Sequence, residues 1–211
     1  MYPAVISRPD IMHVLSRLSQ FNCHPHEEHF AAAKHVLRYL KNDSYGKIVY
    51  KHKSDGLVCY TDADWGNDLE DRKSYSGYVA FLSDGPVAWE SKKQSVVALS
   101  TMEAEYIALC QGTKEIVFQR NLLHELEFGN IIQTPTAIHC DNQSASFLVK
   151  NPTIQKRSKH IDIRFHYVKQ KFHDNTIEVK YVSSDKNVAD ILTKTLDKQK
   201  HTNNCKMLNI M

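Results

Sequence analysis

The chain has 211 residues and a formal net charge of +3, from 27 lysines and arginines against 24 aspartates and glutamates. Hydrophobic residues make up 42% and charged residues 24%, which is typical of globular proteins and excludes a disordered chain. The sequence has no apolar run long enough to span a membrane and no pattern of a secretory signal. Its five cysteines lack paired spacing, which favours a reducing, intracellular compartment.

The first fifty residues predict two helices. Apolar side chains repeat every three to four positions over 9–22 and again over 26–40, and His24-Pro25 separates the two runs. Turn-forming residues follow at 42–46. We therefore expect a helical hairpin over residues 1–50.

After residue 56 the pattern changes to strands that are joined first by turns and later by helices. Strands are expected at 57–62, at 75–82, from 87 onward, at 136–141 and at 177–182. Helices are expected at 101–127, 144–150, 159–173 and 187–194. This order predicts an α/β (α+β) fold, a five-stranded mixed sheet flanked by helices. The domain is expected to span 56–196, followed by a polar, loose tail at 197–211.

Four acidic residues lie at the ends of these elements. Asp62 ends the first strand and Asp141 the fourth, while Glu105 begins the long helix and Asp190 lies in the last one. Sheets of this kind gather ligands at their strand ends, so the four carboxylates are expected to converge. Two-metal cleavage of a phosphodiester needs such a cluster of oxygen ligands. Any one strand-end aspartate, taken alone, is more often a turn former or a helix cap.

The start of the long helix contains two glutamates with different expected roles. Ser100 and Glu103 have the spacing of a capping box, which gives Glu103 a structural role. Glu105 is in phase with Leu109 and Ile116, which should face the sheet. A carboxylate on the inward face is costly unless it is paired or bound to metal. Glu105 is therefore the functional candidate.

Four sequence blocks carry these acids in the order YTDADW, STMEAEY, IHCDNQ and NVADILTK. In this order they resemble the ribonuclease H domain of copia-type LTR retrotransposon Pol polyproteins, and the resemblance covers residues 56–195. Residues 8–41 resemble the helical end of the family's reverse transcriptase. The resemblance implies a ribonuclease H-like fold and a site that binds Mg²⁺, with Mn²⁺ as an alternative. Its catalytic residues and metal ligands would be Asp62, Glu105, Asp141 and Asp190.

The resemblance also implies a context for the chain. Its partners would be an RNA–DNA hybrid and the remainder of the Pol polyprotein, including the reverse transcriptase, with no membrane. The location would be intracellular, either cytoplasmic in a virus-like particle or nuclear. The Tyr-x-Asp-Asp element of the polymerase is absent, so no polymerase activity is expected and Met1 would be an internal position of a longer polyprotein. The loop 183–186 lacks the histidine that many relatives carry before the last aspartate.

Residues 151–173 form a basic stretch, with six lysines and arginines against Asp162. A solvated helix face explains such a stretch as well as a binding surface does. Beside a phosphodiesterase site, we favour contacts with the phosphates of a duplex. The expected nucleic-acid-binding residues are Lys92, Lys93, Lys156, Arg157, Lys159, His160 and Arg164.

The sequence therefore predicts a metal-dependent endoribonuclease that cleaves the RNA strand of RNA–DNA hybrids during reverse transcription. The alternative is a catalytically weak, transposon-derived relic that binds hybrid or structured nucleic acid. A DNA nuclease or integrase-like activity on the same fold agrees less well with the motifs.

Overall fold

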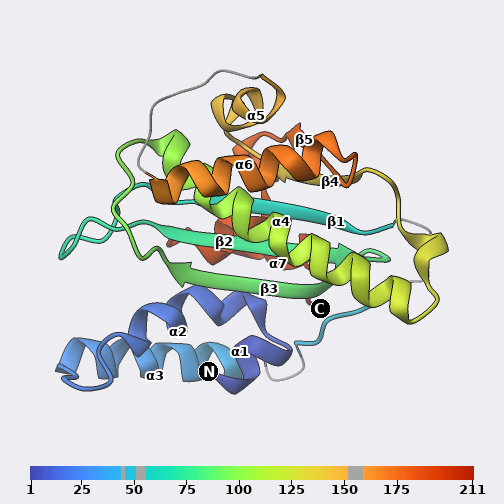
Figure 1. The fold of residues 1–211 in the computed structure, drawn as a ribbon. Coiled ribbons are helices and arrows are strands. Elements are labelled where there is room, and N and C mark those ends of the chain that lie inside the picture. The colour runs from blue at the N-terminus through green and yellow to red at the C-terminus, as the bar shows by residue number, and fades with distance from the viewer. Residues whose placement is uncertain (44–45, 51–55, 152–158) are drawn as a thin grey trace.

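The computed structural model describes residues 1–43, 46–50, 56–151 and 159–211, and its centre is one five-stranded sheet of order β3-β2-β1-β4-β5 (Figure 1). The first three strands pair antiparallel, and β4 and β5 run parallel to β1. This arrangement confirms the predicted mixed sheet. The strands are β1 (Val58–Ala63), β2 (Tyr75–Leu82), β3 (Gly85–Lys93), β4 (Thr136–Cys140) and β5 (Ile177–Tyr181).

Helix α4 (Thr101–Glu125) crosses one face of the sheet, with α5 (Gln143–Lys150) and α6 (Lys159–His173) on the same side (Figure 1). Gly112 allows α4 to approach β1 closely, since a Cβ there would be 2.5 Å from Thr61 Cγ2. The core between these helices and the sheet includes Cys59, Ala80, Leu109, Ile138, Val168 and Val179.

The opposite face of the sheet is covered by the short helix η4 (Val188–Leu192), with α7 (Lys198–Met207) packed on it. Successive residues of a strand point to opposite faces, so Ala80 belongs to the first core and its neighbours Val79 and Phe81 to the second. The second core also includes Ile11, Val36, Leu192 and Leu208.

The N-terminal helices lie along the β3 edge (Figure 1). They are α1 (Tyr2–Ile6), η1 (Pro9–Ile11), α2 (Met12–Ser19) and α3 (Glu27–Asn42). The helix predicted over 9–22 is thus shorter and starts as a 3₁₀ turn with Pro9 at its first position. Short 3₁₀ turns also occur as η2 (Gly129–Ile131) and η3 (Ser184–Lys186).

The C-terminal segment differs most from the prediction, because residues 197–211 are not loose. They contain α7, and Leu208 and Ile210 after it are buried in the second core. Ile210 also forms a β-bridge with Ile48. The helix itself is polar and its apolar anchors come after its end, so no amphipathic repeat signalled it in the sequence.

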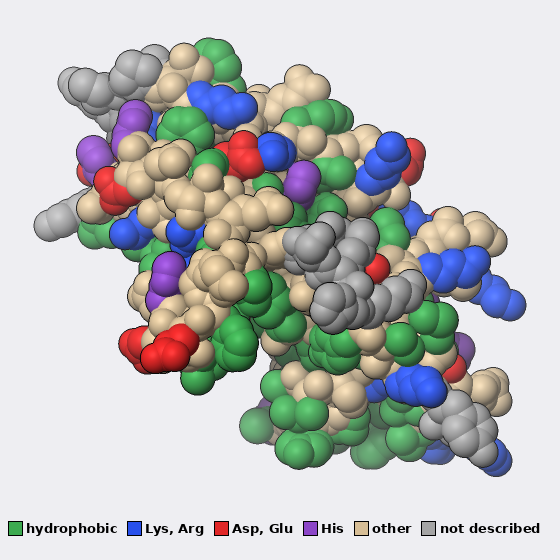
Figure 2. Space-filling view, turned by 90° about the vertical axis from the view of Figure 1, so that its right-hand side faces the viewer, with side chains coloured by type: hydrophobic (Ala, Val, Ile, Leu, Met, Phe, Trp, Pro, Cys, Tyr) green, Lys and Arg blue, Asp and Glu red, His purple; other side chains and the backbone are tan. Residues whose placement is uncertain are grey.

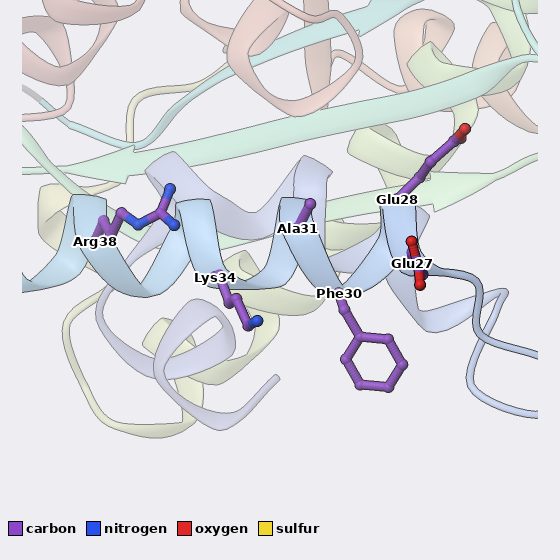
Figure 3. Close-up of a pocket in the computed structure, with 6 residues that line it drawn as sticks. All are labelled: Glu27, Glu28, Phe30, Ala31, Lys34 and Arg38. Atoms are coloured by element: carbon purple, nitrogen blue, oxygen red, sulfur yellow. The ribbon is translucent and has the colours of Figure 1, made fainter.

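The N-terminal helices expose apolar side chains, including Tyr2 and Ile6 of α1 and Phe30 and Leu37 of α3. Hydrophobic side chains gather in the lower part of the surface in Figure 2, at the height of these helices. A shallow hollow of about 690 Å³ lies along α3, and Figure 3 shows Phe30 and Lys34 pointing away from the sheet. None of the four predicted carboxylates lines this hollow. Across the described ranges, no helix is long and apolar enough to cross a membrane.

Candidate active site

Three of the four predicted carboxylates converge at one end of the sheet. Asp62 lies near the end of β1, Asp141 directly follows β4, and Asp190 lies in η4. One side-chain oxygen of each lies within 4.8 Å of the others. Because β1 and β4 are parallel neighbours, their carboxyl ends meet at the same edge and bring Asp62 next to Asp141. This end is on the left in Figure 1, where α4 begins, so Figure 2 views the molecule from the opposite end.

Glu105 lies beside this group of three, on the inward face of α4. It is 6% exposed, and its Oε2 is buried without a hydrogen-bond partner among the residues that the structure describes. Burial raises the pKa of Glu105 well above its ordinary value, and the charges of Asp62 and Asp141 raise it further. A buried oxygen with a free lone pair next to two other carboxylates is a potential ligand for a cation.

Asn187 connects η4 to the sheet through hydrogen bonds. Its side chain is fully buried, and Nδ2 donates a hydrogen bond of 3.0 Å to the backbone oxygen of Thr61, one residue before Asp62. Its Oδ1 accepts from the backbone N–H of Ala189 at 3.3 Å and so caps the start of η4. One side chain thus links the strand that carries Asp62 to the turn that carries Asp190.

Gly77 allows η4 to approach the sheet closely. It is the register partner of Asp62 on β2, and a Cβ at this position would lie 2.6 Å from Leu192 Cβ and 2.9 Å from Thr193 Cγ2. Any larger residue would push η4 away from the sheet. The absence of a side chain at Gly77 therefore helps to bring Asp190 within reach of Asp62.

Two lysines place positive charge on this cluster. Lys194 Nζ lies 3.0 Å from Asp62 Oδ1 and 2.9 Å from Asp190 Oδ1. Lys200 Nζ, from α7, lies 2.5 Å from Asp190 Oδ2, and the Thr193 hydroxyl donates to Asp62 Oδ2. Neither lysine was predicted from the sequence. The only local signal was the four-residue spacing of Asp190 and Lys194.

The charged groups in the cluster shift one another's pKa values. Burial raises the pKa of Asp62 to about 7, an effect that Lys194 opposes and that Asp190 and Asp141 reinforce. Burial lowers the pKa of Lys194, but the charges of Asp62 and Asp190 outweigh it and hold that pKa above its ordinary value. Bringing these carboxylates together is therefore unfavourable unless cations compensate them.

The neighbouring acids Asp64 and Glu103 have structural partners outside the group of three. Asp64 is buried, and its Oδ1 accepts from the backbone N–H of Tyr75 at the start of β2. Ser100 is the N-cap of α4 as predicted, and its hydroxyl accepts from Glu103 N at 3.2 Å. Glu103 Oε2 accepts from Leu99 N at 3.0 Å, one residue before the cap. These contacts agree with a structural role for Glu103 and for Oδ1 of Asp64, whereas Asp64 Oδ2 is buried without a hydrogen-bond partner among the described residues.

The loop without the expected histidine still contacts the cluster. Ser184, in η3, donates from its hydroxyl to Asp141 Oδ2 at 2.6 Å. Asp141 is only partly buried, so this bond fixes the carboxylate on the solvent side of the group. The loop at 183–186 thus contacts the cluster through a neutral hydroxyl.

The two lysines predicted on β3 have different surroundings. Lys92 is exposed, and its Nζ lies 4.0 Å from Glu90. Lys93 Nζ lies 2.6 Å from Asp68 and 3.0 Å from Asp71, both in the turn between β1 and β2. These carboxylates neutralise Lys93 and favour a structural role for it, whereas Lys92 remains available to a phosphate.

The predicted basic stretch is only partly described. Lys156 and Arg157 lie outside the described residues, and Lys159 and His160 are placed only as backbone at the start of α6. Arg164 is partly buried, and its Nη1 is enclosed without a hydrogen-bond partner among the described residues. The binding role of these residues stays a prediction.

The strand order, together with carboxylates at the ends of β1 and β4, defines a ribonuclease H-like fold. Among solved structures the chain is similar to LC11-RNase H1, isolated from compost by a metagenomic approach, with a TM-score of 0.49 and 15% identity. That similarity covers 66% of this chain and 93% of the other. No family model matches the sequence.

Two of the most similar relatives in sequence come from plant transposons. The chain is 40% identical over 200 residues to the retrovirus-related Pol polyprotein of transposon TNT 1-94 from Nicotiana tabacum, which covers 95% of the chain. It is 39% identical over 193 residues to that of transposon RE1 from Arabidopsis thaliana, which covers 91%. The chain belongs to this family, the retrovirus-related Pol polyproteins of copia-type transposons. It spans only 15% and 13% of the length of these two relatives.

The donor set fits a divalent metal ion. The four side chains offer carboxylate oxygens, which Mg²⁺ and Mn²⁺ prefer over nitrogen or sulfur ligands. Glu105 Oε2 has no other partner among the described residues, and burial together with the neighbouring carboxylates raises the pKa values of Asp62 and Glu105.

Proposed function

We propose that this chain is a metal-dependent endoribonuclease that cleaves the RNA strand of RNA–DNA hybrids, as one part of a Pol polyprotein that carries out reverse transcription. The observation that carries the proposal is the convergence of Asp62, Asp141 and Asp190 within 4.8 Å, with Glu105 buried beside them. The same four residues were predicted from the sequence. Membership in the retrotransposon Pol family supports both the reaction and the partner.

The residues that would hold the metal are Asp62, Glu105, Asp141 and Asp190, with Mg²⁺ as the expected ion and Mn²⁺ as the alternative. Two such ions, when bound, activate a water molecule and stabilise the leaving oxygen. The net reaction joins the water oxygen to phosphorus and breaks the bond to the 3′-oxygen, which leaves with a proton. Asp141 would face the substrate, because it is the least buried of the four, whereas Asp62 is fully enclosed.

The substrate would be recognised by its backbone and not by its base sequence. A hybrid duplex is read through its shape, its phosphates and its 2′-hydroxyl groups. Lys92 is an exposed cation on the β3 edge, and the basic stretch that precedes and enters α6 supplies further candidates. We expect these residues to set the affinity for the duplex and to leave the chemistry of the acidic cluster unchanged.

The decisive experiment incubates the purified chain with a hybrid labelled on either strand, in Mg²⁺ and in EDTA. The proposal predicts cuts in the RNA strand only, and only with Mg²⁺. Duplex DNA of the same sequence is the substrate control, and Asp62→Asn is the protein control. Hybrid binding without cleavage in Mg²⁺ would support the alternative of a binding relic, and cleavage of both duplexes would support a DNA nuclease.

A further inference from the structure

Lys194 holds an unusual position for a lysine, because its ammonium group bridges two of the carboxylates that would bind metal. Its Nζ lies 3.0 Å from Asp62 Oδ1 and 2.9 Å from Asp190 Oδ1. Both carboxylates are completely buried, while the lysine side chain keeps 34% of its surface exposed. The ammonium thus closes the cluster from the solvent side.

Every oxygen of these two carboxylates already has a donor or cation from the chain. Lys194 contacts one oxygen of each, the Thr193 hydroxyl donates to the second oxygen of Asp62, and Lys200 lies 2.5 Å from the second oxygen of Asp190. A divalent ion that binds Asp62 or Asp190 must therefore share an oxygen with one of these groups. An ammonium and a divalent cation at adjoining positions repel each other.

Of these three groups, Lys194 is the one that contacts both carboxylates. Thr193 is fully buried at the end of η4, and among the described residues Lys200 Nζ pairs with Asp190 and not with Asp62. The four-carbon stem of Lys194 is flexible and reaches solvent, so its ammonium can leave without a change in the backbone. Its departure would free one oxygen on Asp62 and one on Asp190 at the same time.

We propose that Lys194 is a built-in counter-ion, a positioning residue that occupies the site between Asp62 and Asp190 until a divalent cation displaces it. This inference rests on the proposed function for the identity of the metal site. The inference goes beyond the proposed function because the affinity for the first metal ion would depend on competition with a side chain of the same protein. The lysine keeps the carboxylates assembled without metal and weakens metal binding by the same contacts.

Metal binding without substrate tests the competition directly. Free Mn²⁺ is measured by electron paramagnetic resonance in titrations of the wild-type chain, Lys194→Met, Lys194→Arg and Lys198→Met. Lys198 is an exposed lysine of α7 and serves as the matched control for loss of one charge. We expect Lys194→Met to bind Mn²⁺ about tenfold more tightly, which corresponds to about 1.4 kcal/mol. Lys194→Arg and Lys198→Met should stay within about twofold of wild type, because one keeps the charge and the other lies outside the cluster.

A second readout follows the fold itself. In EDTA, Lys194→Met should melt at a lower temperature than Lys198→Met, and saturating Mn²⁺ should remove the difference. Unchanged or weaker Mn²⁺ binding by Lys194→Met would overturn the proposal, as would a control variant that gains as much affinity. If Lys194→Met does not fold even with Mn²⁺, the same measurement is made on Lys194→Gln.

These titrations also separate this inference from the proposed function. A chain that binds Mn²⁺ with the expected competition but leaves hybrids intact would refute the nuclease and leave the role of Lys194 standing. Absence of Mn²⁺ binding in both wild type and Lys194→Met would refute both.

Discussion

The protein buries carboxylates in two regions whose surroundings differ. In the N-terminal segment, the Asp10 carboxylate accepts from Arg8 Nε at 2.9 Å and Nη2 at 2.7 Å, and from the Tyr39 hydroxyl at 2.6 Å. At the end of the sheet, Glu105 Oε2 has no hydrogen-bond partner among the described residues, and burial raises the pKa of Asp62. The first region is a completed ion pair, whereas in the second Lys194 and Lys200 contact Asp62 and Asp190 but leave Glu105 Oε2 without a partner among the described residues. Incomplete compensation, more than burial itself, distinguishes a functional site from a structural one.

The largest effect should come from removing a ligand charge in the acidic cluster. Asp62→Asn or Glu105→Gln is expected to reduce the rate of hybrid cleavage at least about a thousandfold, because an amide is a poor ligand for Mg²⁺ and the loss is several kcal/mol of stabilisation. Rates are measured at saturating Mg²⁺, with circular dichroism to verify folding.

Asp64→Asn is the matched control for Asp62→Asn, since it removes the same charge two residues away. Asp64 accepts from the backbone of Tyr75, so its variant should keep most of the activity and mainly raise the Mg²⁺ requirement. An inactive Asp64→Asn beside an active Asp62→Asn would move the metal site along the strand.

The opposite result is expected for the completed ion pair. Asp10→Asn should lower the free energy of unfolding by about 3 kcal/mol, because it leaves the Arg8 guanidinium buried with one carboxylate fewer. Cleavage per folded molecule should not change, since the partners of the Asp10 carboxylate are Arg8 and Tyr39 and not residues of the cluster. Urea unfolding and rates at low temperature measure the two quantities, and a large loss of rate in a folded variant would contradict the division into two regions.

The pH dependence of the free energy of unfolding should also distinguish the N-terminal segment from the acidic cluster. Burial, together with the smaller effect of the Arg17 charge, lowers the pKa of His13 to about 4, so this histidine stabilises the fold only while neutral. Its contribution is complete above pH 6.5 and is lost as the pH falls toward 4. We expect a loss of about 2 kcal/mol by pH 4.5 that is absent in His13→Phe. Equal pH dependence of unfolding in the two proteins would exclude His13 as the cause.

The smallest effect concerns the helix cap next to the cluster. Glu103→Gln should lower the free energy of unfolding by about 1 kcal/mol or less, because an amide oxygen can still accept from Leu99 N. Activity should stay near that of the wild type. If Glu103→Gln proved as damaging to cleavage as Glu105→Gln, the separation of cap and ligand would be wrong.

The sequence predicted the sheet and the acids because both depend on local signals. Apolar runs marked all five strands, and the helical phase of the long helix separated Glu105 from Glu103. Lys194 and Lys200 were missed because their role depends on contacts with Asp62 and Asp190 that form only after folding. Helix α7 was not predicted because the helix itself is polar and its buried anchors, Leu208 and Ile210, come only after its end.

The placement of η4 after β5 in the sequence has a consequence for the timing of synthesis. A ribosome that has completed β5 has made the whole sheet and three of the four carboxylates, but neither Asp190 nor the lysines at 194 and 200. All five strands of the nascent domain would thus be synthesised before its acidic site is complete. Acid and counter-ion then emerge within eleven residues of each other. The last carboxylate therefore enters the cluster accompanied by the positive charge that makes its burial tolerable.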